Sequence, residues 1–508
     1  MEQELFLEQS SLGEPRPGSS GPHINQFPNE ILDEIFAFLT LKDRKSVSLV
    51  CHRWNKLAFA PLYMREVLLN MVRYNYKESD FEVLKKSERI YKNIRCSKFS
   101  INHLLFLGPN LESVSCKDGL YKCQLRPILQ CSPKLRELKV SLRQSDKIDN
   151  DTMPVMEQLT SLRLNANKWS IKGFEISEIF PKVTRMDICI SCEGEYTTLL
   201  KVLPHFGPQL QCLQISGDFS LRGIPFNQMP FPQLESFILS DYSRESETEM
   251  EFDTFRNFFV QLTNLRSFDM IPPILDEYLQ EITYNCKKLQ ELRINVNFLR
   301  DSAFASLAQL AHLKTLSIDG ELHEDVLIQC SKPINTIRNL ELRDLWGSLD
   351  LLPYVIPNAV NIILPIYADG LFELVSSFPN LKRLSISDVH GDFQTSDLEV
   401  FVSLEELILD IPRDFYEIFD RLPGNPSLKR LRIFYSGNSK IKKTLDNDIL
   451  RLLQRLPALR FLELDLGFRI TEDGFRRIRQ EFNQCVIQQR IRKNSLLFAG
   501  GFYDRFYF

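Results

Sequence analysis

Apolar residues recur along most of the chain at a spacing that holds over hundreds of residues. Segments such as NLESVSC at residue 110, KLRELKV at 134 and NLRSFDM at 264 place apolar residues at the first, fourth and sixth places, counted from the first apolar residue. Fifteen such segments follow one another, with steps of 21 to 31 residues, most often 24. A short strand that buries three side chains and a return segment that closes each coil would produce this period, so the pattern predicts a solenoid.

Two of the return segments have a clear helical pattern. FRNFFVQLT at 255–263 and DILRLLQRLP at 448–457 place apolar residues at helical spacing and run into the next predicted strand. The whole arrangement, from about residue 90 to about residue 466, resembles the leucine-rich repeat, whose pattern is L-x-x-L-x-L. The resemblance implies an α/β solenoid, a leucine-rich-repeat horseshoe of about fifteen or sixteen repeats.

Several repeats differ from the leucine-rich-repeat pattern at the ninth place. Asn167 and Asn297 match the asparagine that usually closes the turn there, whereas Gly119, Arg143 and Glu321 do not. We therefore expect that most of these turns are closed by the backbone or by a looser loop.

A different apolar pattern precedes the repeats, in FPNEILDEIFAFLTLKDRKSVSLVCHRWNKLAFAPLY at 27–63. Apolar residues from Pro28 to Leu39 recur at three and four residues, which predicts a helix that ends near Thr40. We expect Asp43 to cap a second helix that runs through Val47 to Trp54. The sequence thus predicts an all-α hairpin with a dense apolar stripe.

This hairpin resembles the F-box, a short helical module that docks onto the Skp adaptor of SCF ubiquitin ligases. The match consists of hydrophobe-Pro-x-Glu-Ile-Leu, Ile-Phe-x-x-Leu, Leu-x-Asp and Leu-Val-Cys-x-x-Trp, with Phe27 where leucine is usual. The resemblance implies a set of adaptor-binding residues, although sequence alone does not separate adaptor contacts from the module's own core. The set is Pro28, Ile31, Leu32, Ile35, Phe36, Leu39, Leu41, Val50, Cys51 and Trp54.

The alternative for the hairpin is a helical cap that covers the first repeat, as solenoids require at their ends. About forty residues with so dense a stripe cannot bury all of it internally, and each buried Ile, Leu or Phe contributes roughly 1.5 to 3 kcal/mol. An apolar stripe left uncovered indicates a partner.

These patterns predict five parts of the chain. Residues 1–22, which contain EPRPGSSGP, form a disordered leader, and residues 23–66 form the F-box. Residues 67–109 form a linker and a degenerate first repeat around Ile94 and Cys96. Residues 110–466 form the leucine-rich repeats, and residues 467–508 form a C-terminal cap helix with an aromatic tail.

The third, fifth and seventh places of each strand are expected to face the concave side of the solenoid. Charged residues of both signs fill many of them, among them Lys139, Arg163, Asp187 and Asp269. In the repeat after that of Ile337, a step of 23 residues makes Val360 the first place. Ile362, Leu364 and Ile366 then hold the third, fifth and seventh places and face the concave side. The alternative is a shifted register. The predicted target-binding residues are Ile362, Leu364, Ile366, Arg383, Ile408, Arg430, Arg432 and Phe434.

Composition narrows the possible partners and compartments. The formal net charge of -4, with 25% charged residues, argues against a nucleic-acid-binding charge field. The chain has no apolar run of the roughly 18 to 20 residues that a membrane helix needs, and its N-terminus lacks the pattern of a secretory signal. The 11 cysteines, mostly within apolar patterns, suit reduced thiols of the cytoplasm or nucleus. We expect neither a nucleic-acid nor a membrane partner.

Sequence motifs of catalysis and cofactor binding are missing. The chain contains no Walker loop, no G-x-G-x-x-G after a strand, no H-E-x-x-H and no G-x-S-x-G. Cys189 and Cys192 form a single C-x-x-C, without the second pair that a zinc site needs. We therefore predict no catalytic residues, no cofactor, no metal and no enzymatic activity.

The two resemblances together imply a substrate-recognition subunit of an SCF-type E3 ubiquitin ligase. The F-box would bind the Skp adaptor, and through it the cullin scaffold, while the repeat arc would bind a target protein. The alternatives are a leucine-rich-repeat scaffold outside any ligase and a receptor of the same architecture gated by a small molecule. The sequence identifies neither the target nor any need for its phosphorylation.

Overall fold

The structure is a computed structural model that describes much of the chain in two compact units. The described residues are 24–72, 82, 84–86, 89–97, 105–143, 153–167, 176–190, 203–217, 226–241, 252–300, 302–346, 350–364, 371–386, 403–411, 422, 424–435, 446–465 and 470–490. Unit 1 comprises Met1–Asp118 and Pro127–Leu135, and unit 2 comprises Gly119–Arg126 and Arg136–Phe508. The predicted leader at 1–22 and the aromatic tail lie outside the described residues.

Unit 1 begins with a group of short helices. After the 3₁₀ turn η1 (Ile24–Gln26) come α1 (Asn29–Ala37), α2 (Leu41–Val47), α3 (His52–Ala58) and α4 (Pro61–Met64). The fixed φ of proline suits the first turn of a helix, which accounts for Pro28 before α1 and Pro61 at the start of α4. The predicted all-α character of this segment is confirmed.

The second predicted helix differs in two respects from the structure. Its N-cap is Thr40, whose Oγ1 accepts a hydrogen bond from the Asp43 amide at 3.3 Å, and not Asp43 itself. The chain also leaves the helix after Val47 and starts α3 at His52, because Cys51 is fully extended and caps α3 with its sulfur. A capping residue with extended backbone starts a new helix, so the single helix predicted from Val47 to Trp54 is wrong.

Three parallel strands follow the helices in unit 1. They are β1 (Leu68–Met71), β2 (Asn93–Cys96) and β3 (Ser113–Cys116), with the 3₁₀ turn η2 (Gly108–Asn110) before β3. β2 pairs with both of its neighbours. We predicted one degenerate repeat around Ile94 and Cys96, and the structure adds β1 ahead of it.

Side chains tie the helices of unit 1 to these strands. Arg89 lies over the Phe59 ring, with 3.7 Å between its Cζ and the ring centroid, and donates a hydrogen bond to Asn55 Oδ1 at 3.2 Å. Asn93 Nδ2 donates to the Arg65 carbonyl at 2.5 Å. The helical module and the first strands are therefore packed together.

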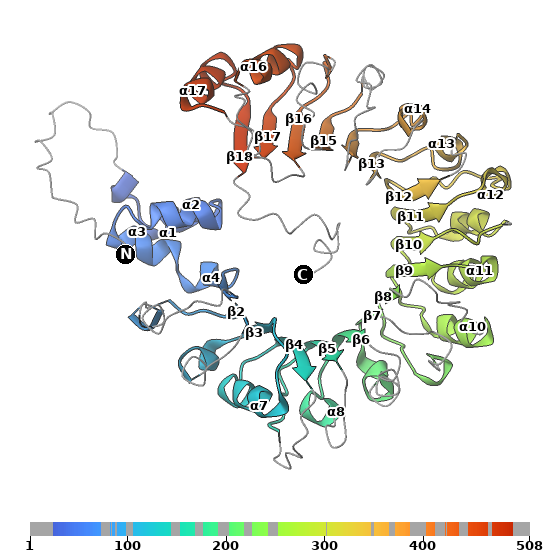
Figure 1. Cartoon of the computed structure of the whole chain (residues 1–508), viewed down its shortest axis with the longest axis horizontal. Helices are drawn as coiled ribbons and strands as arrows, with labels where there is room; N and C mark the ends of the chain where they lie inside the picture. Colours follow the sequence, from blue (N-terminus) through green and yellow to red (C-terminus); the bar gives the residue numbers. More distant parts are fainter. Residues whose placement is uncertain are drawn as a thin grey trace, which may run out of the picture. The chain divides into compact units, whose positions relative to one another are not determined.

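Unit 2 contains a long parallel sheet whose strands pair in chain order, each with the next (Figure 1). This order, with one strand for each turn of the chain, confirms the predicted α/β solenoid. The strands are β4 (Glu137–Arg143), β5 (Ser161–Asn167), β6 (Arg185–Ile190), β7 (Cys212–Gly217), β8 (Ser236–Asp241), β9 (Ser267–Pro273), β10 (Glu291–Asn295), β11 (Thr315–Glu321), β12 (Asn339–Trp346), β13 (Asn361–Leu364), β14 (Arg383–Ile386), β15 (Glu406–Ile411), β16 (Arg430–Tyr435), β17 (Phe461–Asp465) and β18 (Val486–Arg490).

Within unit 2 the strands line the inner side and the helices cover the outer side (Figure 1). The two return helices predicted from the sequence are confirmed as α10 and α16. The helices and 3₁₀ turns of this unit are α8 (Ile176–Ile179), η4 (Gly207–Gln209), η6 (Phe226–Gln228), α10 (Phe252–Gln261), α11 (Asp276–Asn285), η7 (Phe304–Gln309), α12 (Glu324–Ile328), α13 (Leu352–Val355), α14 (Leu371–Ser376), α16 (Asp446–Arg455) and α17 (Glu472–Glu481); α7 (Lys122–Cys131) falls partly in each unit.

The core of unit 2 lies between the strand layer and the outer layer. The first, fourth and sixth places of the repeat are buried, as Leu289, Leu292 and Ile294 illustrate. Helix α10 adds Phe258 and Phe259, which pack against the rings of β8 and β9. The predicted inward places are therefore confirmed.

Backbone hydrogen bonds close several of the turns after the strands, as we expected from the lack of asparagine at most ninth places. The Leu120 amide donates to the Ser141 carbonyl at 2.7 Å, and the Ile274 amide donates to the Asn295 carbonyl at 2.9 Å. Asn297 provides the asparagine contact, because its Oδ1 accepts from the Glu321 amide at 2.5 Å. The side chain of Asn167 lies outside the described residues.

The array continues beyond residue 466, where we predicted its end. Strand β18 follows the cap helix α17 and pairs in parallel with β17, so that Ile487 lies opposite Leu462. Its place opposite Leu464 is occupied by Gln489. The sequence signal was missing because a polar residue stands where the pattern requires an apolar one.

Candidate functional site

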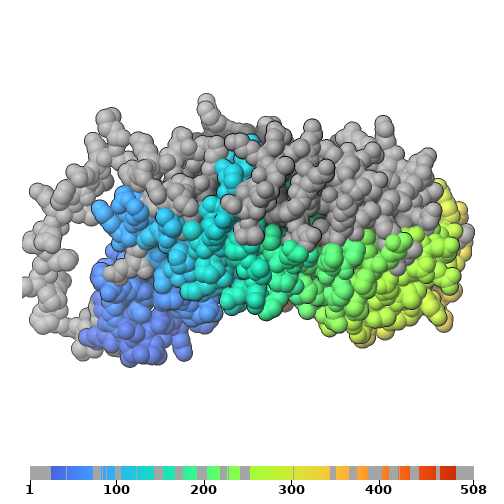
Figure 2. Space-filling model, turned by 90° about the horizontal axis from the view of Figure 1, so that it is seen from below, coloured from blue at the N-terminus to red at the C-terminus, as the bar shows by residue number. Residues whose placement is uncertain are grey.

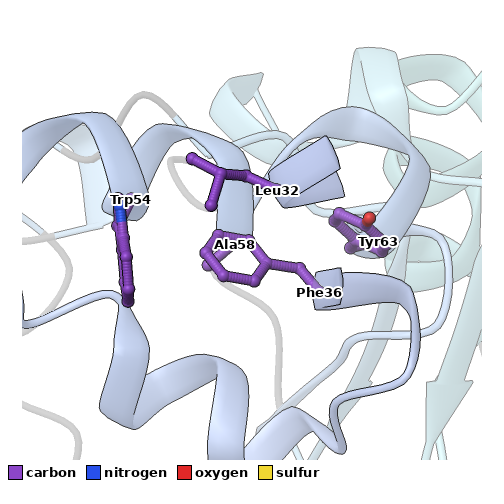
Figure 3. Close-up of a cluster of buried hydrophobic side chains, with 5 residues drawn as sticks. All are labelled: Leu32, Phe36, Trp54, Ala58 and Tyr63. Atoms are coloured by element: carbon purple, nitrogen blue, oxygen red, sulfur yellow. The ribbon is translucent and has the colours of Figure 1, made fainter. Parts of the chain in front are cut away.

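The helices of unit 1 enclose a small core of their own. It consists of Leu32 and Phe36 from α1, Trp54 and Ala58 from α3, and Tyr63 from α4 (Figure 3). The Phe36 and Trp54 rings meet edge to face, with 5.5 Å between their centroids. This geometry is favourable for aromatic pairs, so the core fixes α1 against α3.

Helix α1 carries two apolar stripes side by side. Leu32 and Phe36, four residues apart, face the core, and Leu39 packs against it. Ile31 and Ile35 are each one residue earlier and are exposed, and Phe38 is 90% exposed. Residues four and seven apart share a helix face, so Ile31, Ile35 and Phe38 form an exposed stripe beside the buried one.

Exposed apolar residues also occur in the other segments of the module. Leu49 is 86% exposed and Val50 follows it, both in the segment between α2 and α3, and Leu62 is exposed on α4. We call the residues Pro28, Ile31, Ile35, Phe38, Leu49, Val50 and Leu62 the docking residues. These exposed apolar side chains make the module the candidate site for a protein partner.

The structure divides the ten residues predicted to bind the adaptor. Leu32, Phe36 and Trp54 belong to the core, and Leu39 and Leu41 are partly buried. The five exposed residues are Pro28, Ile31, Ile35, Val50 and Cys51. The prediction omitted Phe38, Leu49 and Leu62, although the spacing of Phe38 from Ile31 and Ile35 was a signal for it.

Arg53 braces the segment that leads into α1. Its Nε donates to Asn29 Oδ1 at 2.8 Å, its Nη1 to the Asn25 carbonyl at 2.7 Å and its Nη2 to the Phe27 carbonyl at 2.6 Å. Charge-assisted hydrogen bonds of this kind are about twice as strong as neutral ones. Arg53 therefore holds the start of α1, and with it Pro28, against α3.

We expect Arg53→Met to loosen residues 24–29 without unfolding the module. The variant keeps the aliphatic part of the side chain but loses three hydrogen bonds, at a cost of about 1.5 to 3 kcal/mol for each bond to a charged group, reduced by solvent at this exposed site. Hydrogen-exchange mass spectrometry should show faster exchange at residues 24–29 and unchanged exchange in α3. Unchanged exchange at residues 24–29 would contradict the brace, and Arg65→Met is the control.

A second brace joins α1, α2 and α4 through Tyr63. Its hydroxyl donates to the Asp33 carbonyl at 2.5 Å, and the Arg44 guanidinium lies 4.8 Å from the centre of its ring. Burial raises the pKa of the Asp33 carboxyl, and the neighbouring Glu30 raises it further. The orientation of α1 is thus fixed at its start by Arg53 and at its middle by Tyr63.

The concave side of unit 2 brings together several of the residues predicted to bind a target. Cross-strand pairing places Ile408 beside Arg432, and Asp410 beside Phe434. Arg383 and Arg430 lie on either side of Glu406 in the same row. We call Arg383, Ile408, Arg430, Arg432 and Phe434 the concave patch.

Buried carboxylates partly neutralise the cations of the concave patch. Arg383 Nε lies 2.9 Å from Glu406 Oε2, and Arg432 Nε lies 3.4 Å from Glu406 Oε1 and 3.6 Å from Glu463 Oε2. Arg430 and Arg432 each lie 5.8 Å from the centre of the Phe461 ring. The patch therefore presents guanidinium groups and apolar surface together.

Ion pairs also cross the strands earlier in the array. Asp187 lies 3.1 Å from Arg163, and Asp269 lies 3.3 Å from Arg293. Burial raises the pKa of both carboxyls, and the neighbouring arginines oppose this rise. These paired charges hold neighbouring strands together.

The predicted orientation of Ile362 and Leu364 is wrong. Both are buried, since Ile362 pairs with Leu340 at the fourth place of the repeat. The first place of this repeat is therefore the buried Ala359 and not Val360, and a shift of one residue turns every side chain of the strand to the opposite face. Ile366 lies outside the described residues.

The described residues contain no cluster of His, Cys, Asp and Glu that could hold a metal ion. Their cysteines are free, including Cys96 and Cys116, whose sulfurs lie 3.8 Å apart on neighbouring strands. Across the same residues, no helix has both the length and the apolar character needed to cross a membrane.

Comparison with known proteins identifies the helical module. Residues 24–69 match the F-box-like family model. The chain is 24% identical to human F-box/LRR-repeat protein 12 over 305 residues, which cover 58% of this chain and 79% of the relative. It is also 24% identical to the bovine protein of the same name over 327 residues, which cover 63% of this chain and 87% of the relative.

Two solved structures align with much of the chain at low similarity. A chain from the crystal structure of the yeast Rad7 and Elc1 complex aligns over 91% of both chains, with 14% identity and a TM-score of 0.35. An internalin from Listeria monocytogenes aligns over 64% of this chain and 86% of its own, with 14% identity and a TM-score of 0.29.

Proposed function

Because the chain is an F-box and leucine-rich-repeat protein, we propose that it is the substrate-recognition subunit of an SCF-type E3 ubiquitin ligase. The F-box-like module binds the Skp adaptor and connects the chain to the cullin scaffold. The repeats bind a target protein. Catalysis belongs to the RING protein and its conjugating enzyme, and this chain contributes by holding target lysines near the charged thioester.

The observation that carries this proposal is the exposure of the docking residues next to a core that is already complete. Leu32, Phe36 and Trp54 fill the interior of the module, so the neighbouring Ile31 and Ile35 are not required there. Covering an apolar side chain contributes roughly 1.5 to 3 kcal/mol when it goes from fully exposed to fully buried. Several such side chains on one small module supply enough free energy for a stable complex with the adaptor.

The adaptor contacts that we propose are the exposed members of the predicted set together with the three additions. Core residues support the module from inside and do not reach a partner. The proposed contacts are Pro28, Ile31, Ile35, Phe38, Leu49, Val50, Cys51 and Leu62.

The concave patch is the surface that we propose for the target protein. Its guanidinium groups and apolar side chains suit a partner segment that is acidic or phosphorylated and also carries apolar residues. Glu406 already binds Arg383 and Arg432, so Arg430, which lies on an exposed place of β16, has the greatest freedom to meet such a segment.

We expect the double variant Arg383→Ala, Arg430→Ala to lose the target and keep the adaptor. Losing two charge-assisted contacts costs about 1.5 to 3 kcal/mol each, which predicts at least about a tenfold weaker target complex. Proximity labelling in cells, with and without proteasome inhibition, should identify targets as proteins whose labelling by the wild-type chain rises on inhibition. The double variant should label them at least about tenfold less.

The matched control is Lys182→Ala, which removes an exposed cation outside the concave patch. It should label targets and adaptor as the wild type does. If the double variant labels the same targets as strongly, the concave patch is not the target surface. If no protein responds to proteasome inhibition, the chain is a scaffold outside any ligase.

A further inference from the structure

The outer side of unit 2 has an unusual composition at one repeating place. It lies five residues before the buried residue at the first place of the repeat. In three repeats this first place is Leu265, Leu289 and Ala359. In these three repeats the place five residues earlier holds Val260, Tyr284 and Tyr354. All are exposed, Tyr284 to 71% and Tyr354 to 76%.

The same place is polar in several other repeats of unit 2, which indicates that the fold does not require an apolar residue there. It holds the exposed residues His205 before Leu210 and Gln454 before Leu459. An exposed aromatic side chain contributes nothing to the core of a solenoid. The two tyrosines therefore call for a different explanation from the buried residues of the same helices.

The apolar residues extend over neighbouring outer elements. Val260 lies on α10, Tyr284 on α11 and Tyr354 on α13, and the exposed Ile328 ends α12 between them. Figure 1 shows these helices in succession along the outer side of the unit. In Figure 2, part of this span forms the green and yellow surface.

Exposed cations accompany the apolar residues along the edge where the chain passes from the helices to the strands. Lys287 donates to the Thr283 carbonyl at 2.7 Å and to Gln309 Oε1 at 3.2 Å, and Lys288 donates to Asn264 Oδ1 at 2.7 Å. Arg338 donates to the Asn358 carbonyl at 3.2 Å. These acceptors are uncharged, so the positive charges are not neutralised by the contacts that position them.

Further cations lie on this edge, while the exposed acidic residues Glu277, Glu324 and Asp325 stand in the first turns of α11 and α12. Lys314 and Lys332 are also exposed on it. The nearby Glu281 is already engaged, because its Oε1 lies 3.4 Å from Arg256 and its Oε2 accepts from Asn285. The edge thus offers exposed cations interspersed with exposed apolar and aromatic side chains, since Lys332 holds the place of Tyr284 and Tyr354 in the repeat of Ile337.

We propose that Val260, Tyr284, Ile328 and Tyr354, with Lys287 and Lys288, form an outer docking strip for an acidic protein segment that carries aromatic or aliphatic residues. The cations select negative charge, and the tyrosines cover apolar side chains of the partner while keeping their hydroxyls in water. A nucleic acid would use the cations but would leave Val260 and Ile328 without an apolar partner. The strip is independent of the adaptor surface and of the concave patch.

The test uses a phage-displayed library of random peptides selected on the full-length chain. Binding phage are first depleted on the variant Tyr284→Ser, Tyr354→Ser, Lys287→Ser, Lys288→Ser, so that only peptides specific for the strip remain. All four side chains are exposed, and the variant should unfold thermally like the wild type. The expected peptides are rich in Asp and Glu and contain aromatic or aliphatic residues.

A labelled peptide from this selection should bind Tyr284→Ser, Tyr354→Ser at least about tenfold more weakly than the wild type in fluorescence anisotropy. The matched control is Lys134→Ser, Lys182→Ser, since both lysines directly precede the buried residue that opens their strand, as Lys288 does. It should bind the peptide as the wild type does.

Three results would overturn the outer docking strip. The first is an equal loss of peptide binding in the Lys134 and Lys182 control, which would indicate unspecific charge attraction. The second is a selected set of peptides without acidic residues, or no selected peptide at all. The third is displacement of the peptide by single-stranded DNA at lower concentration than by a second acidic peptide.

Discussion

A chain in which Ile31 and Ile35 are both changed to lysine is expected to bind the Skp adaptor at least about 100-fold more weakly than the wild type. Both side chains are exposed on one stripe of α1. The substitutions remove apolar area that the complex would bury and place two ammonium groups in the interface, where an unpaired charge is costly. Surface plasmon resonance with the immobilised adaptor measures the change.

The stability of the module should not change in this variant. The core of Leu32, Phe36 and Trp54 stays intact, so thermal unfolding should match the wild type. The matched control is Ile90→Lys, Leu105→Lys, which changes two exposed apolar residues of unit 1 outside residues 24–69. Equal adaptor affinity in the Ile31 and Ile35 variant and the wild type would place the adaptor on another surface.

The change of Phe36 to alanine is expected to weaken adaptor binding through a different cause, the loss of the module's core. Phe36 is buried among Leu32, Trp54, Ala58 and Tyr63 (Figure 3). Replacing a buried Phe with Ala typically costs about 3 to 5 kcal/mol, a large share of the stability of so small a module. In hydrogen-exchange mass spectrometry, peptides from residues 29–63 should lose protection while peptides from α11 and β10 keep it.

Phe38 provides the matched control, because it belongs to the same helix segment but is almost fully exposed. Phe38→Ala should leave hydrogen exchange unchanged and should weaken adaptor binding, since Phe38 is a docking residue. The two variants therefore separate the core of the module from its binding surface. Similar exchange in Phe36→Ala and the wild type would contradict the assignment of Phe36 to the core.

The solenoid could be predicted from the sequence because its signal is repeated many times. Each strand buries the same three places, so an error in one repeat does not affect the rest. The exceptions are local. The predicted register of the strand of Ile362 was wrong by one residue, because Val360 and Ile363 are as apolar as the true inward residues. Strand β18 was not predicted because Gln489 is polar.

The helical module could be predicted as a unit, but the division of its residues could not. Ile31 and Leu32 are adjacent and equally apolar, and so are Ile35 and Phe36. Hydrophobicity alone does not decide which of them faces the core. The decision depends on the rotation of α1 against α3, which the Phe36–Trp54 contact and the hydrogen bond from Tyr63 to Asp33 determine.

The concave patch was partly predictable for the same reason as the solenoid. The repeat correctly placed Arg430 and Arg432 on alternate positions of β16, and strand pairing brings Ile408 beside Arg432. The ion pairs of Glu406 with Arg383 and Arg432 depend on side-chain conformations across strands, which a single sequence does not encode.

Calorimetric titration of the full-length chain with the purified Skp adaptor tests the central proposal most directly. The expected result is a 1:1 complex with a Kd of about 1 μM or tighter and a negative heat-capacity change, the mark of apolar surface buried on binding. The Ile31→Lys, Ile35→Lys chain should give no measurable heat under the same conditions. A wild-type chain that does not bind the adaptor, or a double variant that binds it equally well, would contradict the proposal.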